Sequence, residues 1–199
     1  MFISSSIAYF IALASPGPDT AVIIKQCSEK GRSAGIYTAL GIGIGILIHC
    51  ILAVSGISLL ALSYPPLKIF ISIIGGAYIF YIGTSFFINK KKIPTNNTNN
   101  KGSFMIGLLT NILNIKAFIF FVSLFSILVE SLSGVFYYLY PIYFSLSTAL
   151  WFSFLSMLLT SDKYSYINIY DNFFIKCLMS ITLCFIGLYI ISNSIYEYF

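Results

Sequence analysis

Two prolines and a glycine interrupt the first hydrophobic stretch of the chain, which runs from residue 2 to residue 24 and contains Ser15-Pro16-Gly17-Pro18-Asp19. Each proline lacks a backbone N–H and its ring clashes with the preceding turn, so an α-helix cannot continue through this segment. Residues 1–15 would span only about 22 Å as a helix, less than the roughly 30 Å of a bilayer's hydrocarbon core. A complete crossing therefore requires a helix broken at membrane depth, where the freed backbone must be buried in protein or face water.

The composition identifies a multi-pass membrane protein. Of 199 residues, 58% are hydrophobic and only 9% are charged, and the mean hydropathy is +0.92, far above soluble globular chains. Six stretches are long enough to cross a bilayer, namely residues 2–24, 36–62, 67–88, 104–129, 135–160 and 173–195. No loop has room for a soluble catalytic domain. We therefore predict a single transmembrane domain over residues 1–199, no enzyme activity, and neither a cofactor nor a metal site.

The net charge of +5 reflects membrane topology, because the basic residues follow loop parity. Nine of them lie at the even-numbered ends of the spans: Lys25, Lys30, Arg32, Lys90, Lys91, Lys92, Lys101, Lys163 and Lys176. The opposite side carries only Lys68. The positive-inside rule places the basic side in the cytoplasm and both termini outside, and it leaves no reason to expect nucleic-acid binding.

The start of the chain has a second reading, because Ala12-Leu13-Ala14 resembles a signal-peptidase site after a short apolar run. No Lys or Arg precedes Lys25, so the positive region of a signal peptide is missing. We therefore expect the first span to be retained.

The polar segment 89–103 divides the chain into two halves, 1–88 and 104–199, with three spans each. Three is an odd number, so halves related by duplication must have opposite orientations in the membrane. A shift of 104 residues pairs Gly83 with Gly187 and Ile82 with Ile186, a weak internal similarity. We predict an all-α membrane protein of six transmembrane helices in two inverted three-helix repeats, with the first helix broken at Pro16-Gly17-Pro18.

Small residues mark where helices are expected to touch. The second span carries Gly41, Gly43 and Gly45, and the third carries Gly75, Gly76 and Gly83. Such spacing lets backbones approach closely in lipid. These faces serve packing within the chain, and they are also compatible with a homodimer.

Asp19, His49 and Lys116 are the ionisable residues inside the predicted spans, where a charge costs at least about 2.5–3.5 kcal/mol. Asp19 directly follows the break. It either caps the resumed helix and offsets its dipole, or binds a substrate ammonium and carries a proton in exchange. His49 is a second proton-coupling candidate, although a histidine bonded to a neighbouring helix is the commoner outcome.

A second polar group lies in the fourth span, where Asn111 and Asn114 share one helix face and Lys116 follows. The asparagines can bridge helices or line a cavity. Lys116 either extends to the cytoplasmic surface or pairs with Asp19 across the two halves. With the amide groups and carbonyls of the first break, these residues offer partners for both charges of a zwitterionic amino acid. The predicted substrate-binding residues are Pro16, Gly17, Pro18, Asp19, Asn111, Asn114 and Lys116.

The motifs taken together resemble the LysE/RhtB family of amino-acid exporters over the whole length of the chain. They are Pro16-Gly17-Pro18-Asp19, Gly31-Arg32-x-Ala34-Gly35, Leu40-Gly41-x-x-x-Gly45-x-x-x-His49, Gly76-Ala77-x-x-x-x-Tyr81-x-Gly83 and Gly107-Leu108-Leu109-Thr110-Asn111-x-Leu113-Asn114-x-Lys116-Ala117. The resemblance implies efflux of amino acids such as homoserine, threonine, lysine or arginine, by exchange with protons. The family usually has a proline where this chain has Ile115, so the second break is expected to be softer.

The sequence thus favours a secondary exporter of amino acids in a bacterial cytoplasmic membrane, working by proton antiport and alternating access. Its partners are an amino-acid substrate, protons and the lipid bilayer. Two alternatives remain: a non-transporting membrane subunit, and a thiol electron-transfer protein. The second would need two of Cys27, Cys50, Cys177 and Cys184 to meet, although no C-x-x-C pair is present.

Overall fold

The computed structural model describes residues 2–15, 17–56, 63–88, 100–128, 134–161 and 173–196. Over these ranges the chain is helical and contains no strand. The helices are α1 (Phe2–Ala14), α2 (Pro18–Lys30), α3 (Arg32–Val54), α5 (Pro65–Ile88), α6 (Asn100–Ile112), α7 (Ile115–Leu128), α8 (Phe136–Leu159) and α9 (Phe173–Tyr196). The expected all-α membrane fold is therefore present. The last residues of the predicted linker 89–103 belong to α6, which already begins at Asn100.

Each half has the same order of helices, a broken pair followed by two long helices. In the first half α1 and α2 meet at an angle of 49°, and in the second half α6 and α7 meet at 58°. Helices α3 and α8 are each long and apolar enough to cross a membrane alone, and each bent pair supplies one further candidate crossing. The remaining two predicted crossings coincide with α5 and α9, which have 24 residues each.

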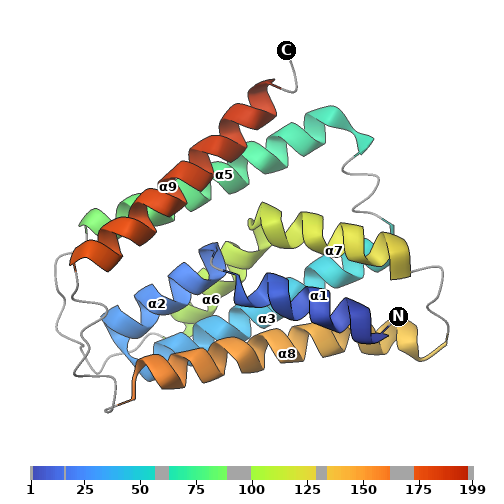
Figure 1. The fold of residues 1–199 in the computed structure, drawn as a ribbon, viewed down its shortest axis with the longest axis horizontal. Coiled ribbons are helices and arrows are strands. Elements are labelled where there is room, and N and C mark those ends of the chain that lie inside the picture. The colour runs from blue at the N-terminus through green and yellow to red at the C-terminus, as the bar shows by residue number, and fades with distance from the viewer. Residues whose placement is uncertain are drawn as a thin grey trace.

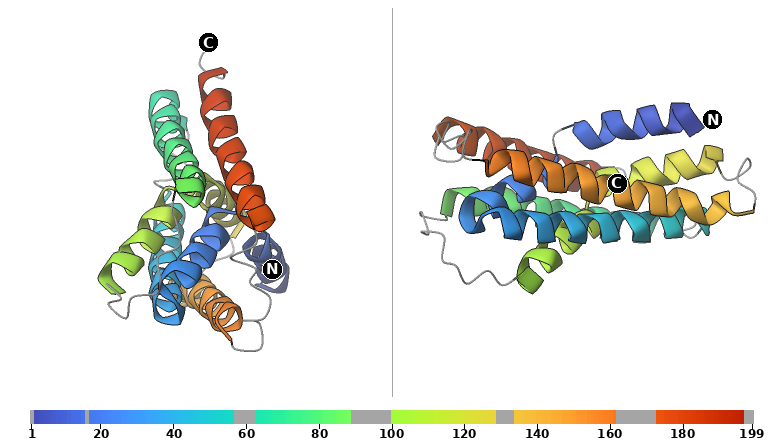
Figure 2. Two further views of the ribbon diagram at one scale, coloured as in Figure 1. Left: turned by 90° about the vertical axis from the view of Figure 1, so that its left-hand side faces the viewer. Right: turned by 90° about the horizontal axis from the view of Figure 1, so that it is seen from below.

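The broken pairs lie between two pairs of long helices (Figure 1 and Figure 2). Helices α3 and α8 pack side by side on one side, and α5 packs along α9 on the other. In each pair the two helices run in opposite directions, and the path from α1 to α2 opposes the path from α6 to α7 (Figure 1). The C-terminal end of α2 and the first residues of α3 and α6 all lie at one end of the bundle (Figure 1).

Glycines allow the helices to approach backbone to backbone, as the sequence predicts. A Cβ built on Gly41 of α3 would lie 2.1 Å from the Phe104 carbonyl oxygen of α6, and one on Gly107 of α6 would lie 2.1 Å from the Thr38 carbonyl oxygen of α3. Gly43 lies against α8 in the same way, and Gly76 lies against Gly187 of α9. These glycine faces are therefore used for contacts within the chain, which leaves them unavailable to a homodimer.

Gly31 produces the sharp reversal between α2 and α3. Its φ of 84° is a left-handed conformation that residues with a side chain rarely adopt. Its N–H bonds the Cys27 carbonyl oxygen at 2.9 Å and closes the last turn of α2. The reversal brings α3 back along α2, with Cys27 against Gly35.

The four cysteines of the chain are all free, so none of them forms a disulfide. Cys27 lies beside Gly35 of α3, while Cys50 lies fifteen residues further along that helix, about 22 Å away. Cys177 and Cys184 are two turns apart on α9.

Candidate functional site

The first helix break is built by Gly17 and Pro18. Gly17 has extended backbone angles and precedes α2, and Pro18 occupies the first helical position, where a missing N–H costs nothing. Asp19 follows in the first turn, where a carboxylate is stabilised by the helix dipole. Pro16 lies outside the described residues. The break therefore places Asp19 at the start of α2 with its side chain directed toward the second half of the chain.

Asp19 is held by the two asparagines of the second break. The side-chain amides of Asn111 and Asn114 donate hydrogen bonds to Asp19 Oδ2 at 2.9 Å and 3.0 Å. Asn111 is fully buried and Asn114 is 3% exposed. Because hydrogen bonds from neutral donors to a charged acceptor are stronger than neutral pairs, this clamp fixes the relative position of α2 and of the α6–α7 break. The predicted association of Asp19, Asn111 and Asn114 is present.

Two further acceptor atoms at this site have no hydrogen-bond partner among the described residues. They are the second carboxylate oxygen of Asp19, Oδ1, and the side-chain oxygen of Asn111, and both are buried. Buried polar atoms are seldom left without a partner in folded proteins. The free oxygen of Asp19 is therefore a position where a proton or a ligand N–H would be stabilised.

Asn114 also caps the second break. Its side-chain oxygen accepts a hydrogen bond from the backbone N–H of Lys116 at 3.1 Å, which satisfies one of the free N–H groups at the start of α7. The angle of 58° between α6 and α7 exceeds the 49° between α1 and α2. The second break bends as sharply as the first although residue 115 is isoleucine, because the asparagine cap interrupts the helix without a proline. That this break is the softer of the two stays a prediction.

His49 supports the same break from α3. Its Nε2 donates to the backbone carbonyl of Asn111 at 2.9 Å, a carbonyl near the interruption that also accepts from the Asn114 N–H. His49 is 3% exposed, and its Nδ1 has no partner within the described chain. This is the bond to a neighbouring helix that we expected as the commoner outcome for a single histidine.

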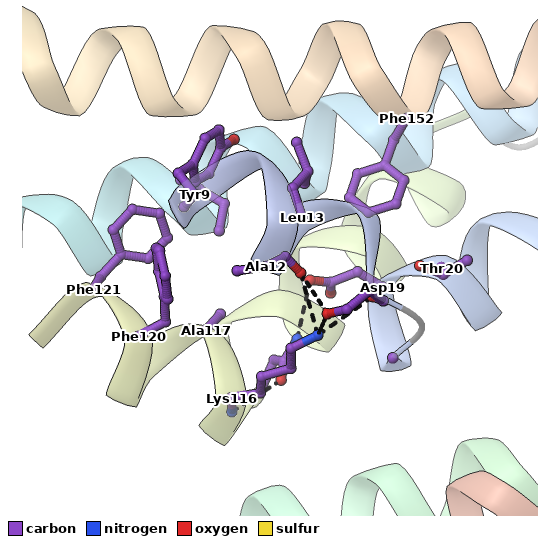
Figure 3. A pocket seen from close by; sticks show the side chains of 14 residues that line it. Tyr9, Ala12, Leu13, Asp19, Thr20, Lys116, Ala117, Phe120, Phe121 and Phe152 are labelled. Atoms are coloured by element: carbon purple, nitrogen blue, oxygen red, sulfur yellow. Dashed lines mark hydrogen bonds between the residues drawn. The ribbon is translucent and has the colours of Figure 1, made fainter. Parts of the chain in front are cut away.

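Lys116 does not pair with Asp19 directly. Its Nζ donates to the carbonyl oxygens of Ala12 and Ser15, each at 3.3 Å, and to the Ser15 hydroxyl. These carbonyls end α1, where a cation is stabilised by the helix dipole. Figure 3 shows the lysine reaching the end of α1 next to Asp19. The second residue of α7 thus binds the end of α1, just as the second residue of α2 binds the end of α6.

A partly open pocket of about 50 Å³ lies beside these groups, with room for a few water molecules. Its polar end is formed by Ser15, Asp19, Thr20, Asn114 and Lys116. Its other walls are apolar and come from α1, α3, α7 and α8, and they include Leu13, Phe120, Phe121 and Phe152 (Figure 3). The sequence did not single out this apolar wall, because aromatic residues of α7 look like the lipid-facing ones around them.

Broken apolar helices that meet around a buried carboxylate are typical of membrane transport proteins. The comparison with protein families agrees. The model of the LysE type translocator matches residues 10–194, and the chain belongs to this family. The resemblance found in the sequence is confirmed, as is the prediction of a transport protein.

Several curated proteins are similar to this chain. The threonine efflux protein of Escherichia coli strain K12 is 30% identical over 137 residues, which cover 65% of this chain and 66% of that protein. The leucine efflux protein of Salmonella choleraesuis is 31% identical over 123 residues, which cover 59% of this chain and 58% of that protein. The matched segments thus span 66% and 58% of the length of these two relatives. No solved structure matches it significantly.

Exchanging Ile115 for proline is expected to leave the fold intact. Residue 115 is the first of α7, where the N–H has no partner within the helix, and Asn114 before it is not helical. We expect thermal stability in detergent to stay within about 1 kcal/mol of the parent protein. Ile119→Pro is the matched control, since residue 119 is inside the helix and its side chain is exposed; it should cost about 3 kcal/mol or more. Equal losses in both variants would contradict this description of the break.

Proposed function

We propose that this protein is a secondary exporter of amino acids across a bacterial cytoplasmic membrane, with its substrate site at the two helix breaks. The observation that carries the proposal is the meeting of Asp19 with Asn111 and Asn114 beside a pocket. These residues lie 92 and 95 positions apart in the chain. Buried polar groups at paired helix breaks are the typical architecture of a transporter site.

The chemistry of the pocket suits a zwitterion. The buried oxygen of Asp19 offers an acceptor for a substrate ammonium. Lys116 lines the same pocket and offers a cation for a substrate carboxylate, and so does the positive N-terminal end of α2. The names of the similar threonine and leucine efflux proteins support an amino acid as the substrate. Gly17, Pro16 and Pro18 contribute the backbone of this site in the proposal.

An inverted repeat of two three-helix halves is part of the proposal. The opposed directions of equivalent helices support it (Figure 1). So do the contacts between α5 and α9. A Cβ built on Gly187 would lie 2.8 Å from the backbone nitrogen of Phe80, and one on Gly83 would lie 2.9 Å from that of Cys184. Shifting by 104 residues exchanges these two contacts, because Phe80 corresponds to Cys184 and Gly83 to Gly187.

Alternating access with proton antiport completes the proposed mechanism. A proton on the free oxygen of Asp19 would neutralise the carboxylate when no substrate ammonium is present, so the two cations would compete for one site. His49 is a second candidate for proton transfer through its unpartnered Nδ1. The ends of α2, α3 and α6 that share one end of the bundle carry Lys30, Arg32 and Lys101, which supports a cytoplasmic placement of that end and external termini.

Transport by the purified protein tests the proposal. The full chain in proteoliposomes loaded with unlabelled amino acids should exchange a radiolabelled amino acid faster than equally loaded liposomes without protein. An imposed pH gradient should change the direction of net flux. A folded, monodisperse protein that exchanges no amino acid from a complete panel would contradict the exporter and favour a non-transporting membrane subunit.

A further inference from the structure

We infer that the pocket selects amino acids with an uncharged side chain and holds that side chain against its apolar wall, with Phe120 limiting its size. This inference rests on the proposed function, because it assigns a substrate class to the same site. It follows from the residues that would surround the substrate side chain once the ammonium and carboxylate of the substrate are bound.

In the proposed complex, the charged groups at the polar end of the pocket bind the α-ammonium and α-carboxylate of the substrate. Among the described residues that line it, Asp19 is the one carboxylate and Lys116 the one cation. An α-ammonium would bind Asp19 Oδ1, and an α-carboxylate would be attracted by the charge of Lys116, whose Nζ donates to Ala12 and Ser15. Asn114 is already engaged, since its amide donates to Asp19 and its oxygen accepts from the Lys116 N–H, and it carries no charge that could pair with a second charge on the substrate. A second charge on the substrate would find no counter-charge in this part of the chain.

The opposite wall is closed by packed aromatic rings. Phe120 lies edge-on to Phe121 with ring centroids 5.3 Å apart, and Tyr9 packs on both of them at 6.4 Å and 6.1 Å. The Tyr9 hydroxyl is directed away into α8, where it donates to the Phe144 carbonyl oxygen at 2.9 Å. Leu13 and Phe152 complete the wall (Figure 3). This wall presents carbon to a bound side chain.

A cationic side chain would therefore lose its hydration without gaining an anion. A contact with the ring faces would recover only part of that cost. An anionic side chain would likewise lose its hydration against carbon without gaining a cation. Uncharged side chains lose little water and gain contact area, so the wall discriminates by charge first.

Phe120 is the residue through which size is set. It lines the pocket and is only partly buried, whereas Phe121 is 2% exposed and belongs to the core between α1, α7 and α8. Truncating Phe120 enlarges the space next to the substrate with less damage to the core. A pocket enlarged by a ring admits larger side chains, and such changes shift selectivity by about tenfold or more.

Exchange in proteoliposomes tests both the selection by charge and the size limit set by Phe120. Vesicles containing the full-length protein are loaded with unlabelled leucine, threonine, phenylalanine, lysine or glutamate, and entry of radiolabelled leucine is followed. We expect exchange with leucine and threonine, and rates at the level of empty liposomes for lysine and glutamate. Phe120→Ala should raise the ratio of phenylalanine to leucine exchange about tenfold. Ile119→Ala, next to it but facing away from the pocket, should leave the ratio unchanged.

The outcomes separate the inference from the proposed function. Exchange of lysine or glutamate as fast as leucine would overturn the charge selection and leave an amino-acid exporter. An unchanged ratio in Phe120→Ala would overturn the role of Phe120; Phe120→Leu serves as a milder substitution if the alanine variant is not monodisperse. Absence of exchange with every amino acid would instead contradict the exporter.

Discussion

Asp19→Asn is expected to reduce amino-acid export by at least about tenfold while the protein stays folded. An amide can still accept from Asn111 and Asn114 through its oxygen, so the link between the two breaks is retained in geometry. Its NH₂ group then takes the place of the free, buried carboxylate oxygen, where it can neither attract an ammonium nor take up a proton. Hydrogen bonds to a charged group contribute about 1.5–3 kcal/mol, which is tenfold or more in binding.

The measurement is radiolabelled efflux from transport-deficient cells, normalised to the amount of protein in the membrane. Glu29→Gln is the matched control, because Glu29 is a carboxylate on the same helix that does not line the pocket. It should export like the parent protein. Full export and full proton coupling in Asp19→Asn would remove Asp19 from the mechanism and leave it the role of a helix cap.

Gly107→Ala is expected to lower the stability of the folded protein. The added Cβ would lie 2.1 Å from the Thr38 carbonyl oxygen and 2.9 Å from its carbon, so backbone, not a movable side chain, is in the way. Alanine favours a helix over glycine by about 1 kcal/mol. Overpacking typically costs about 1–3 kcal/mol, and here relief requires α3 and α6 to separate along their contact. The clash therefore outweighs the gain in helix propensity.

Thermal unfolding in detergent, followed by loss of the monodisperse chromatographic peak, measures this effect. Gly17→Ala is the control for stability, because its Cβ would meet nothing closer than 3.6 Å and its φ of −174° is open to any residue. It should unfold near the temperature of the parent protein. If Gly107→Ala were as stable as Gly17→Ala, the close approach of α3 and α6 would be wrong.

The elements of the fold were largely predictable, because hydrophobic length and proline position act locally. The described helices overlap the six apolar stretches, and the break at Gly17 and Pro18 is where the prolines require it. The sequence assigned Asp19, Asn111 and Asn114 to one site, and the structure brings them into hydrogen-bond contact. Their role in substrate binding stays a prediction.

Other parts of the site depend on three-dimensional packing and could not be read from one sequence. Lys116 was expected at the surface or on Asp19, but the end of α1 lies within its reach and offers several carbonyl acceptors. Tyr9 and Phe120 line the pocket only because α1 and α7 lie side by side there. The sharp second break follows from the asparagine cap. A proline was looked for at this position in the sequence, and a cap was not considered.

The two breaks differ in their mechanical character. Prolines lock the first, since no rearrangement can supply the N–H that Pro18 lacks. In the second, Leu113, Asn114 and Ile115 all retain an N–H, so α6 and α7 can join into one continuous helix when the Asn114 cap is released. The first break is thus a rigid kink and the second a flexible hinge. Movement between conformations should therefore be concentrated in the second half of the chain.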